Sequence, residues 1–143
     1  MSIIVVMTTT DSLGEARSIA AALVERKLAA CAQISSIQSF YTWEGEVQDD
    51  DEFRVLIKTT KARYADVEAA ILELHSYDLP AIVAFEITHA YGPYADWVAD
   101  SVSRSTPDQP IHLLSNDLLT DFIPVARPPT LGVTSIFSSD IDI

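Results

Sequence analysis

The feature that most constrains the fold of this chain is a long alternating segment at residues 29–43. Odd- and even-numbered side chains would lie on opposite faces of a strand about 40 Å long, which is long for a small domain. The turn Glu44-Gly45-Glu46 follows, and a second strand is expected near residues 53–60. The acidic run at 49–52 is predicted to interrupt this strand, as a bulge or as the solvated shoulder of the hairpin. The sequence therefore predicts a long β-hairpin.

Hydrophobic periodicity assigns the remaining elements. They are, in chain order, a buried strand at 3–7, a helix at 12–27, a helix at 61–75, a strand at 81–88 and a short helix through 92–98. Ser12 and Glu15 have the spacing of a capping box at the start of the first helix. The order β-α-β-β-α-β with a terminal helix indicates an α+β, ferredoxin-like sandwich.

Residues 103–143 have a different composition. They contain five of the seven prolines and are rich in Ser and Thr. Proline density argues against a regular helix or a central strand. We therefore expect a domain at residues 1–102 and an appended Pro/Ser/Thr-rich extension at 103–143.

Charge excludes several classes of partner. The chain carries 21 acidic and 9 basic residues, a formal charge of −12. Neither nucleic acid nor an anionic membrane surface is an expected partner, because both are bound by clustered Lys and Arg. Cys31 is the single cysteine, so no intrachain disulfide can form. No secretory signal and no apolar run of about 18 residues occurs, and we expect a cytoplasmic protein.

The hairpin also indicates assembly. Its apolar side chains exceed what a small monomer leaves exposed; they are Ile37, Phe40, Tyr41 and Trp43. Pairing with further copies in a closed ring would cover them. The alternative is that the C-terminal extension covers the open face of the sheet.

Five short segments carry a family resemblance. They are Lys27-Leu28-Ala29-Ala30-Cys31-Ala32, Tyr41-Thr42-Trp43-Glu44-Gly45-Glu46, Leu56-Ile57-Lys58-Thr59-Thr60, His75-Ser76-Tyr77-Asp78-Leu79-Pro80 and Tyr94-Ala95-Asp96-Trp97. In order and spacing they resemble the CutA family of divalent-cation tolerance proteins. The resemblance covers about residues 2–102.

The resemblance implies a ferredoxin-like fold assembled as a tight homotrimer, with long hairpins joining sheets between subunits. It also implies the architecture of the PII signalling proteins, whose trimers bind small ligands in clefts between subunits, and a link to tolerance of copper and other divalent metals. Two positions depart from the family pattern: Ser76 and Ala81 stand where the family commonly has Pro and Glu. Loss of that Glu removes a carboxylate from the inter-subunit cleft.

Cys31 and His75 are the candidate metal ligands. A Cys31 thiolate suits Cu(I) or Zn(II), but the same residue fits a small buried position at the start of a strand. His75 can bind metal or hydrogen-bond a helix C-terminus. The acidic run at 49–52 can hold hard cations weakly or form a solvated surface. No closely spaced Cys/His motif occurs, so no cofactor is required and copper or another divalent cation is the candidate ion.

A second candidate site is a ligand cleft. It would gather Tyr41, Trp43, Lys58, Tyr77 and Trp97. Aromatic walls with a lysine suit a small anionic or planar ligand. The alternative is that the aromatic side chains anchor a subunit interface.

The chain is not expected to be an enzyme, because it has neither a nucleophile elbow nor a glycine-rich phosphate loop. We therefore predict a homotrimer that binds copper-type divalent ions weakly in metal tolerance. The alternative is a PII-like signalling or scaffold trimer that binds a small ligand or a partner protein between subunits.

Overall fold

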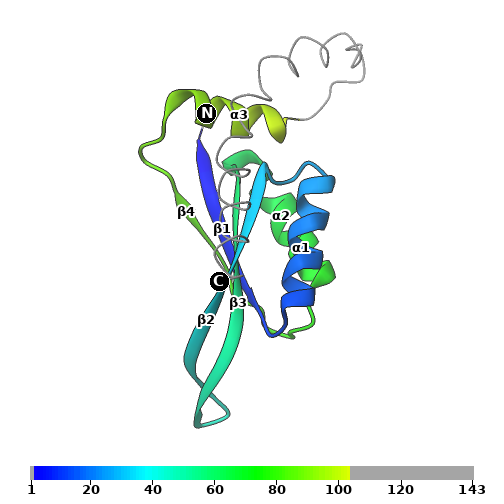
Figure 1. Cartoon of the computed structure of the whole chain (residues 1–143), viewed down its shortest axis with the longest axis vertical. Helices are drawn as coiled ribbons and strands as arrows, with labels where there is room; N and C mark the ends of the chain where they lie inside the picture. Colours follow the sequence, from blue (N-terminus) through cyan, green and yellow to red (C-terminus); the bar gives the residue numbers. More distant parts are fainter. Residues whose placement is uncertain (1, 104–143) are drawn as a thin grey trace, which may run out of the picture. The chain divides into compact units, whose positions relative to one another are not determined.

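A computed structural model describes residues 2–103 and contains a single four-stranded antiparallel sheet in the order β2-β3-β1-β4 (Figure 1). The elements are β1 (Ile3–Thr10), α1 (Leu13–Glu25), β2 (Cys31–Trp43), β3 (Glu46–Thr60), a 3-10 turn (Lys61–Arg63), α2 (Tyr64–Leu74), β4 (Ile82–Glu86) and α3 (Gly92–Ser101). This is the predicted ferredoxin-like α+β order with a terminal helix. Apart from Ser103, the predicted extension at 103–143 lies outside the described residues.

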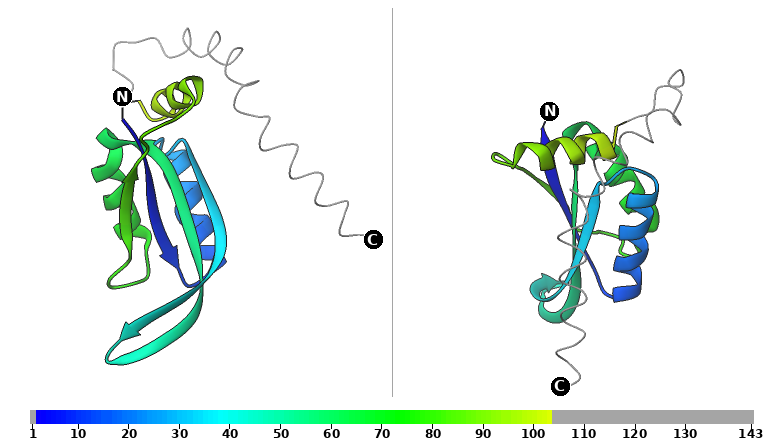
Figure 2. Two further views of the ribbon diagram at one scale, coloured as in Figure 1. Left: turned by 90° about the vertical axis from the view of Figure 1, so that its left-hand side faces the viewer. Right: turned by 45° about the horizontal axis from the view of Figure 1, so that its top comes forward.

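The hydrophobic core lies between the sheet and the helices α1 and α2, which cover the same face (Figure 2). Alternate side chains of β1 and β3 enter it, as the two-residue period of a strand requires. The fully buried residues include Val6, Val55 and Ile57 from the sheet and Ile19, Leu23, Val67 and Ile71 from the helices. The opposite face of the sheet is covered by α3 only at one end (Figure 2).

Local signals fix both ends of α1. The Ser12 side chain accepts a hydrogen bond from the Glu15 amide at 3.2 Å, which is one half of the predicted capping box. The other half is replaced, because the Glu15 carboxylate accepts hydrogen bonds from the amide and hydroxyl of Ser76 at 2.6 and 2.8 Å. At the other end Lys27 is left-handed, with φ 58°, and the Leu28 amide donates to the Leu23 carbonyl, as in a Schellman motif. Glu15 therefore ties α1 to the loop after α2.

The hairpin is longer than predicted on its second strand. The prediction that residues 49–52 interrupt it is wrong, because β3 pairs with β2 without a break from Glu46 to Lys58. Asp49, Asp50 and Asp51 are exposed, so their charges stay in water while the backbone ladder continues. Glu44 and Gly45 have φ of 52° and 82°, the left-handed pair of a two-residue hairpin turn.

Other predicted boundaries move by a few residues. The first strand continues to Thr10, and the side chains of Thr8 and Thr10 are buried despite their polarity. The predicted helix at 61–75 begins with the 3-10 turn, and the last helix runs three residues past 98. None of the helices between residues 2 and 103 has the length and apolar character needed to cross a bilayer.

Candidate functional site

The predicted site residues, apart from His75, fall into two groups at opposite ends of the β2–β3 ladder. Cys31 pairs with Lys58 near α3, whereas Tyr41 pairs with Gln48 near the hairpin turn. Ten residues of β3 separate Lys58 from Gln48, which is on the order of 30 Å along the strand. The structure therefore divides the predicted ligand cleft: Lys58 lies in one group and Tyr41 in the other.

The first group, the α3-end cluster, consists of Cys31, Gln33, Lys58, Tyr94 and Trp97. The Cys31 sulfur lies 3.7 Å from the Tyr94 hydroxyl oxygen. Lys58 donates to the Gln33 side-chain oxygen at 2.8 Å, and its Nζ lies 6.0 Å from the centre of the Tyr94 ring. The rings of Tyr94 and Trp97 are 5.6 Å apart. These contacts place a phenol beside the thiol of the half-buried Cys31, and an indole and an ammonium group beside the ring of that phenol.

Burial is the main cause of a raised pKa at Tyr94, and the contact with Cys31 adds to it. The phenol therefore keeps its proton throughout the physiological pH range. A protonated phenol beside the sulfur can donate a hydrogen bond to a thiolate, which is the form of cysteine that binds metal.

His75, the second predicted metal ligand, lies on the loop that follows α2, and its side chain is fully buried. Its Nε2 lies 2.7 Å from the Thr9 carbonyl oxygen, which can only accept, so Nε2 carries the proton. The Tyr77 amide donates to Nδ1 at 3.1 Å, and a Glu15 carboxylate oxygen lies 3.4 Å from the same nitrogen. Both ring nitrogens are thus engaged, and a metal ion would have to displace one of these partners.

Cys31 and His75 do not share a site. Thr9, which holds His75, pairs with Arg54, whereas Cys31 pairs with Lys58, four residues further along β3. This separation is about 13 Å along the strand. Across residues 2–103, no three His, Cys, Asp or Glu side chains are grouped so that they could hold a metal ion.

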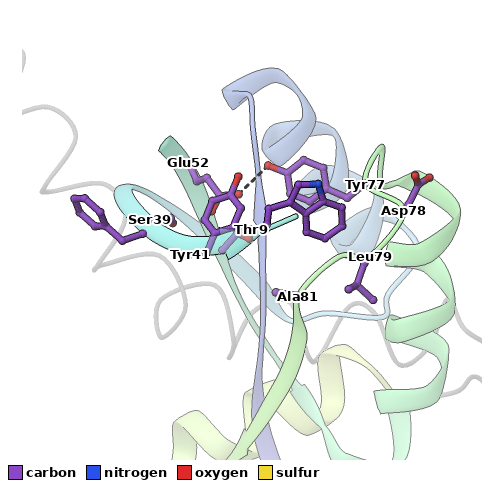
Figure 3. Close-up of a pocket in the computed structure, with 10 residues that line it drawn as sticks. Thr9, Ser39, Tyr41, Glu52, Tyr77, Asp78, Leu79 and Ala81 are labelled. Atoms are coloured by element: carbon purple, nitrogen blue, oxygen red, sulfur yellow. Dashed lines mark hydrogen bonds between the residues drawn. The ribbon is translucent and has the colours of Figure 1, made fainter. Parts of the chain in front are cut away.

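The second group lines a cavity of about 500 Å³ between the outer hairpin, β1 and the loop before β4, here called the hairpin cavity. Four of the residues that line it are aromatic: Phe40, Tyr41, Trp43 and Tyr77. Leu79 and Ala81 add aliphatic surface from the loop, and Figure 3 shows them across the cavity from Tyr41. Three of the five predicted cleft residues therefore meet here.

Two carboxylates line the hairpin cavity, and neither was predicted as part of it. Glu52 is only 9% exposed and accepts a hydrogen bond from the Tyr77 hydroxyl at 2.8 Å (Figure 3). Asp78 is exposed at the rim. The strand register could have revealed Glu52, because a continuous β3 places it opposite Ile37 and on the same face as Tyr41.

The phenols of the cavity are neutral. Burial raises the pKa of Tyr77, and the hydrogen bond to Glu52 and the charge of Glu52 raise it further. The pKa of Tyr41 is also raised, mainly by the hydrogen bond that its hydroxyl donates to Asp50. The site thus combines neutral aromatic walls with negative charge.

Comparison with known proteins assigns the family. Residues 4–101 match the family described as CutA1 divalent ion tolerance protein. The chain belongs to the CutA1 family. The divalent-cation tolerance protein CutA of Thermus thermophilus is 41% identical over 98 residues, which cover 68% of this chain and 95% of the relative. That of Archaeoglobus fulgidus is 39% identical over 94 residues, covering 66% and 92%.

Solved CutA1 structures share the fold. The divalent cation tolerance protein of Thermus thermophilus has a TM-score of 0.68 at 39% identity, covering 71% of this chain and 99% of that one. CutA of Synechococcus elongatus has a TM-score of 0.69 at 31% identity, covering 71% and 91%. The CutA1 match at 4–101 includes both the α3-end cluster and the hairpin cavity.

Proposed function

We propose that this CutA1 chain acts in divalent-metal tolerance by binding copper-type ions weakly, as a homotrimer and without catalysing a reaction. The observation that carries the proposal is the family match over residues 4–101, with relatives named divalent-cation tolerance proteins. Acidic composition supports it, because a formal charge of −12 concentrates cations near the surface.

Cys31 is the stronger of the two proposed ligands. Cys31 is partly exposed and its sulfur contacts one hydroxyl, so a soft ion can bind without breaking a backbone contact. His75 is the weaker ligand, since an ion must first displace either the Thr9 carbonyl or the Tyr77 amide. Weak affinity is expected because one thiolate, with water completing the coordination, is far from a closed four-ligand site.

Exposed apolar surface supports the homotrimer. Phe40 is 68% exposed, Val47 75% and Phe85 55% in the single chain. Patches of this kind on a small protein usually mark an interface. Light scattering coupled to gel filtration tests this part: a mass about three times 15.7 kDa is expected, and a monomer would contradict it.

Calorimetric titration of Zn(II), and of Cu(I) under anaerobic conditions, tests the metal ligands. Cys31→Ser should lower the affinity at least about tenfold, because even groups that only support a ligand cost that much. His75→Ala should lower it less. His89→Ala is the control, since this exposed residue has no ligand partner at a suitable spacing. Unchanged binding in both Cys31→Ser and His75→Ala would exclude the two residues as ligands.

The hairpin cavity favours a second candidate function, a PII-like trimer that binds a small ligand. Its volume of about 500 Å³ falls within the usual range of small-molecule sites, roughly 300–1,000 Å³. Thermal-shift screening of metabolites, with Trp43→Ala beside the wild type, tests it. A stabilising compound whose effect is lost in the variant supports this function, and a screen without any such compound contradicts it.

A further inference from the structure

We propose that the hairpin cavity binds the ammonium group of a small organic cation. The inference rests on the second candidate function and specifies its ligand class. It differs from the prediction of a small anionic or planar ligand, whose anionic part depended on placing Lys58 beside the aromatic residues. In the structure Lys58 belongs to the α3-end cluster and does not line the cavity.

The charge of the cavity wall favours a cation. Glu52 and Asp78 line it, and no Lys or Arg of the described residues does. Arg54 is the nearest cation along the same face of β3, two residues beyond Glu52, and it too lies outside the wall. Glu52 is largely removed from water, so its attraction for a bound charge is screened less than that of a surface carboxylate.

The rings of the wall favour the same ligand class. An ammonium group is attracted to the faces of Trp, Tyr and Phe, and several such rings together form the usual site for alkylated ammonium ions. The hydroxyl hydrogens of Tyr41 and Tyr77 are directed to Asp50 and Glu52. Those two hydrogens are therefore not offered to an anion, while Tyr41 and Trp43 remain 42% and 51% exposed.

The residues that line the cavity favour an organic ligand over a bare metal ion. A hard divalent cation needs about six oxygen ligands, whereas this wall is mainly aromatic and aliphatic. Leu79 and Ala81 supply apolar surface beyond the carboxylate. The ligand that fits has one positive end near Glu52 and an apolar or methylated body.

The test uses choline and 3,3-dimethylbutan-1-ol, which have the same shape but differ in charge, together with inorganic phosphate. Binding to the full-length chain is followed by NMR. We expect choline to bind at least about tenfold more tightly than the neutral alcohol, from ring and carboxylate contacts combined, and phosphate not to bind. Equal binding of choline and the alcohol would overturn the inference and leave an apolar pocket.

Two variants test whether choline binds in the hairpin cavity. Glu52→Gln, which keeps an acceptor for Tyr77, should weaken choline binding about 5- to 10-fold, and Trp43→Ala about 3- to 30-fold. Asp51→Asn, next in sequence but exposed and outside the cavity, removes the same charge and should change binding less than about twofold. Urea midpoints confirm that each variant is folded. Equal losses in Glu52→Gln and Asp51→Asn would overturn the site.

The outcomes also separate this inference from the function on which it rests. If an anionic or neutral compound binds in a Trp43-dependent way and choline does not, the second candidate function stands and the cationic ligand class is wrong. If no compound binds at this cavity, both are wrong.

Discussion

The two halves of the β2–β3 ladder differ although they form one continuous hydrogen-bonded ribbon. The inner half, residues 31–35 with 54–58, lies under the helices and buries Val55 and Ile57 completely. The outer half, residues 37–43 with 46–52, leaves Trp43 51% exposed. The strand pairing is the same, so the difference is made by the helices that cover one half only. The inner half stabilises the fold, and the outer half offers surface for binding.

The two halves also differ in charge. The inner half carries Arg54 and Lys58 on its open face, and the outer half carries the acidic run at 49–52. The negative charge of the outer half is the reason for proposing an organic cation at Glu52. A soft metal ion is proposed at Cys31 because of the thiolate, which must outweigh the like charge of the neighbouring Lys58.

The largest expected contrast between the halves is in stability. Ile57→Ala removes a fully buried side chain and should lower the free energy of unfolding by about 2–5 kcal/mol. Val47→Ala, at a position 75% exposed in the single chain, can remove only contacts made between subunits and should cost clearly less. Urea unfolding measures both. Comparable losses would mean that the outer half is also buried, as it would be within a subunit interface.

The next effect concerns the carboxylate at the hairpin cavity. Tyr77→Phe leaves the buried Glu52 carboxylate without its hydroxyl donor and should cost about 1.5–3 kcal/mol. Tyr64→Phe is the matched control, because Tyr64 donates to Glu68 at 2.7 Å on α2, where water can replace the donor. Denaturant midpoints of the two variants should differ. Equal losses would show that Glu52 is as accessible to water as Glu68.

Alkaline pH gives a smaller effect in the same region. The pKa of Tyr77 is raised in the folded state, chiefly by burial and then by Glu52, so above pH 10 the unfolded chain loses this proton first. Stability that is present below pH 10 should therefore fall as pH rises further. Urea unfolding between pH 8 and 11 measures the slope, which Tyr77→Phe should reduce. An unchanged slope in the variant would assign the loss to other groups.

The smallest expected effect is at Lys58. Lys58→Ala removes an exposed hydrogen bond to Gln33 and should change stability by no more than about 0.5 kcal/mol. Choline binding at the hairpin cavity should stay within about twofold of the wild type. A marked loss of choline binding would show that Lys58 belongs to the same site as Tyr41 and Trp43, as the sequence alone predicts.

Most of the fold was predictable because local periodicity dominates it. The core face of α1 and the strand at β1 follow directly from the spacing of apolar residues. The continuous pairing of residues 49–52 was not predictable in this way, since four consecutive acidic residues suggest a break. These residues are held in a strand by pairing with β2, whose register the Glu44-Gly45 turn sets. The composition of the acidic run itself does not contain this information.

The candidate site was predictable only in part. Tyr41, Trp43 and Tyr77 line one cavity of the single chain, whereas Lys58 and Trp97 lie at the other end of the β2–β3 ladder. Aromatic character alone does not give these positions, because they depend on the length and register of the two strands. His75 was a candidate for metal binding or for a hydrogen bond at a helix C-terminus. Its two hydrogen bonds, to the Thr9 carbonyl and from the Tyr77 amide, depend on how β1 lies beside its loop.

The central claim is that the two ends of the β2–β3 ladder bind different ligands. The most direct test uses the two tryptophans of the chain, because one lies at each end of the ladder. Trp97→Phe leaves Trp43 as a reporter of the hairpin cavity, and Trp43→Phe leaves Trp97 beside Tyr94 as a reporter of the α3-end cluster. Fluorescence titrations with Cu(I) and with choline should change Trp97 with the metal and Trp43 with choline. If either ligand changes both tryptophans equally, or if the pattern is reversed, the division into two sites is wrong.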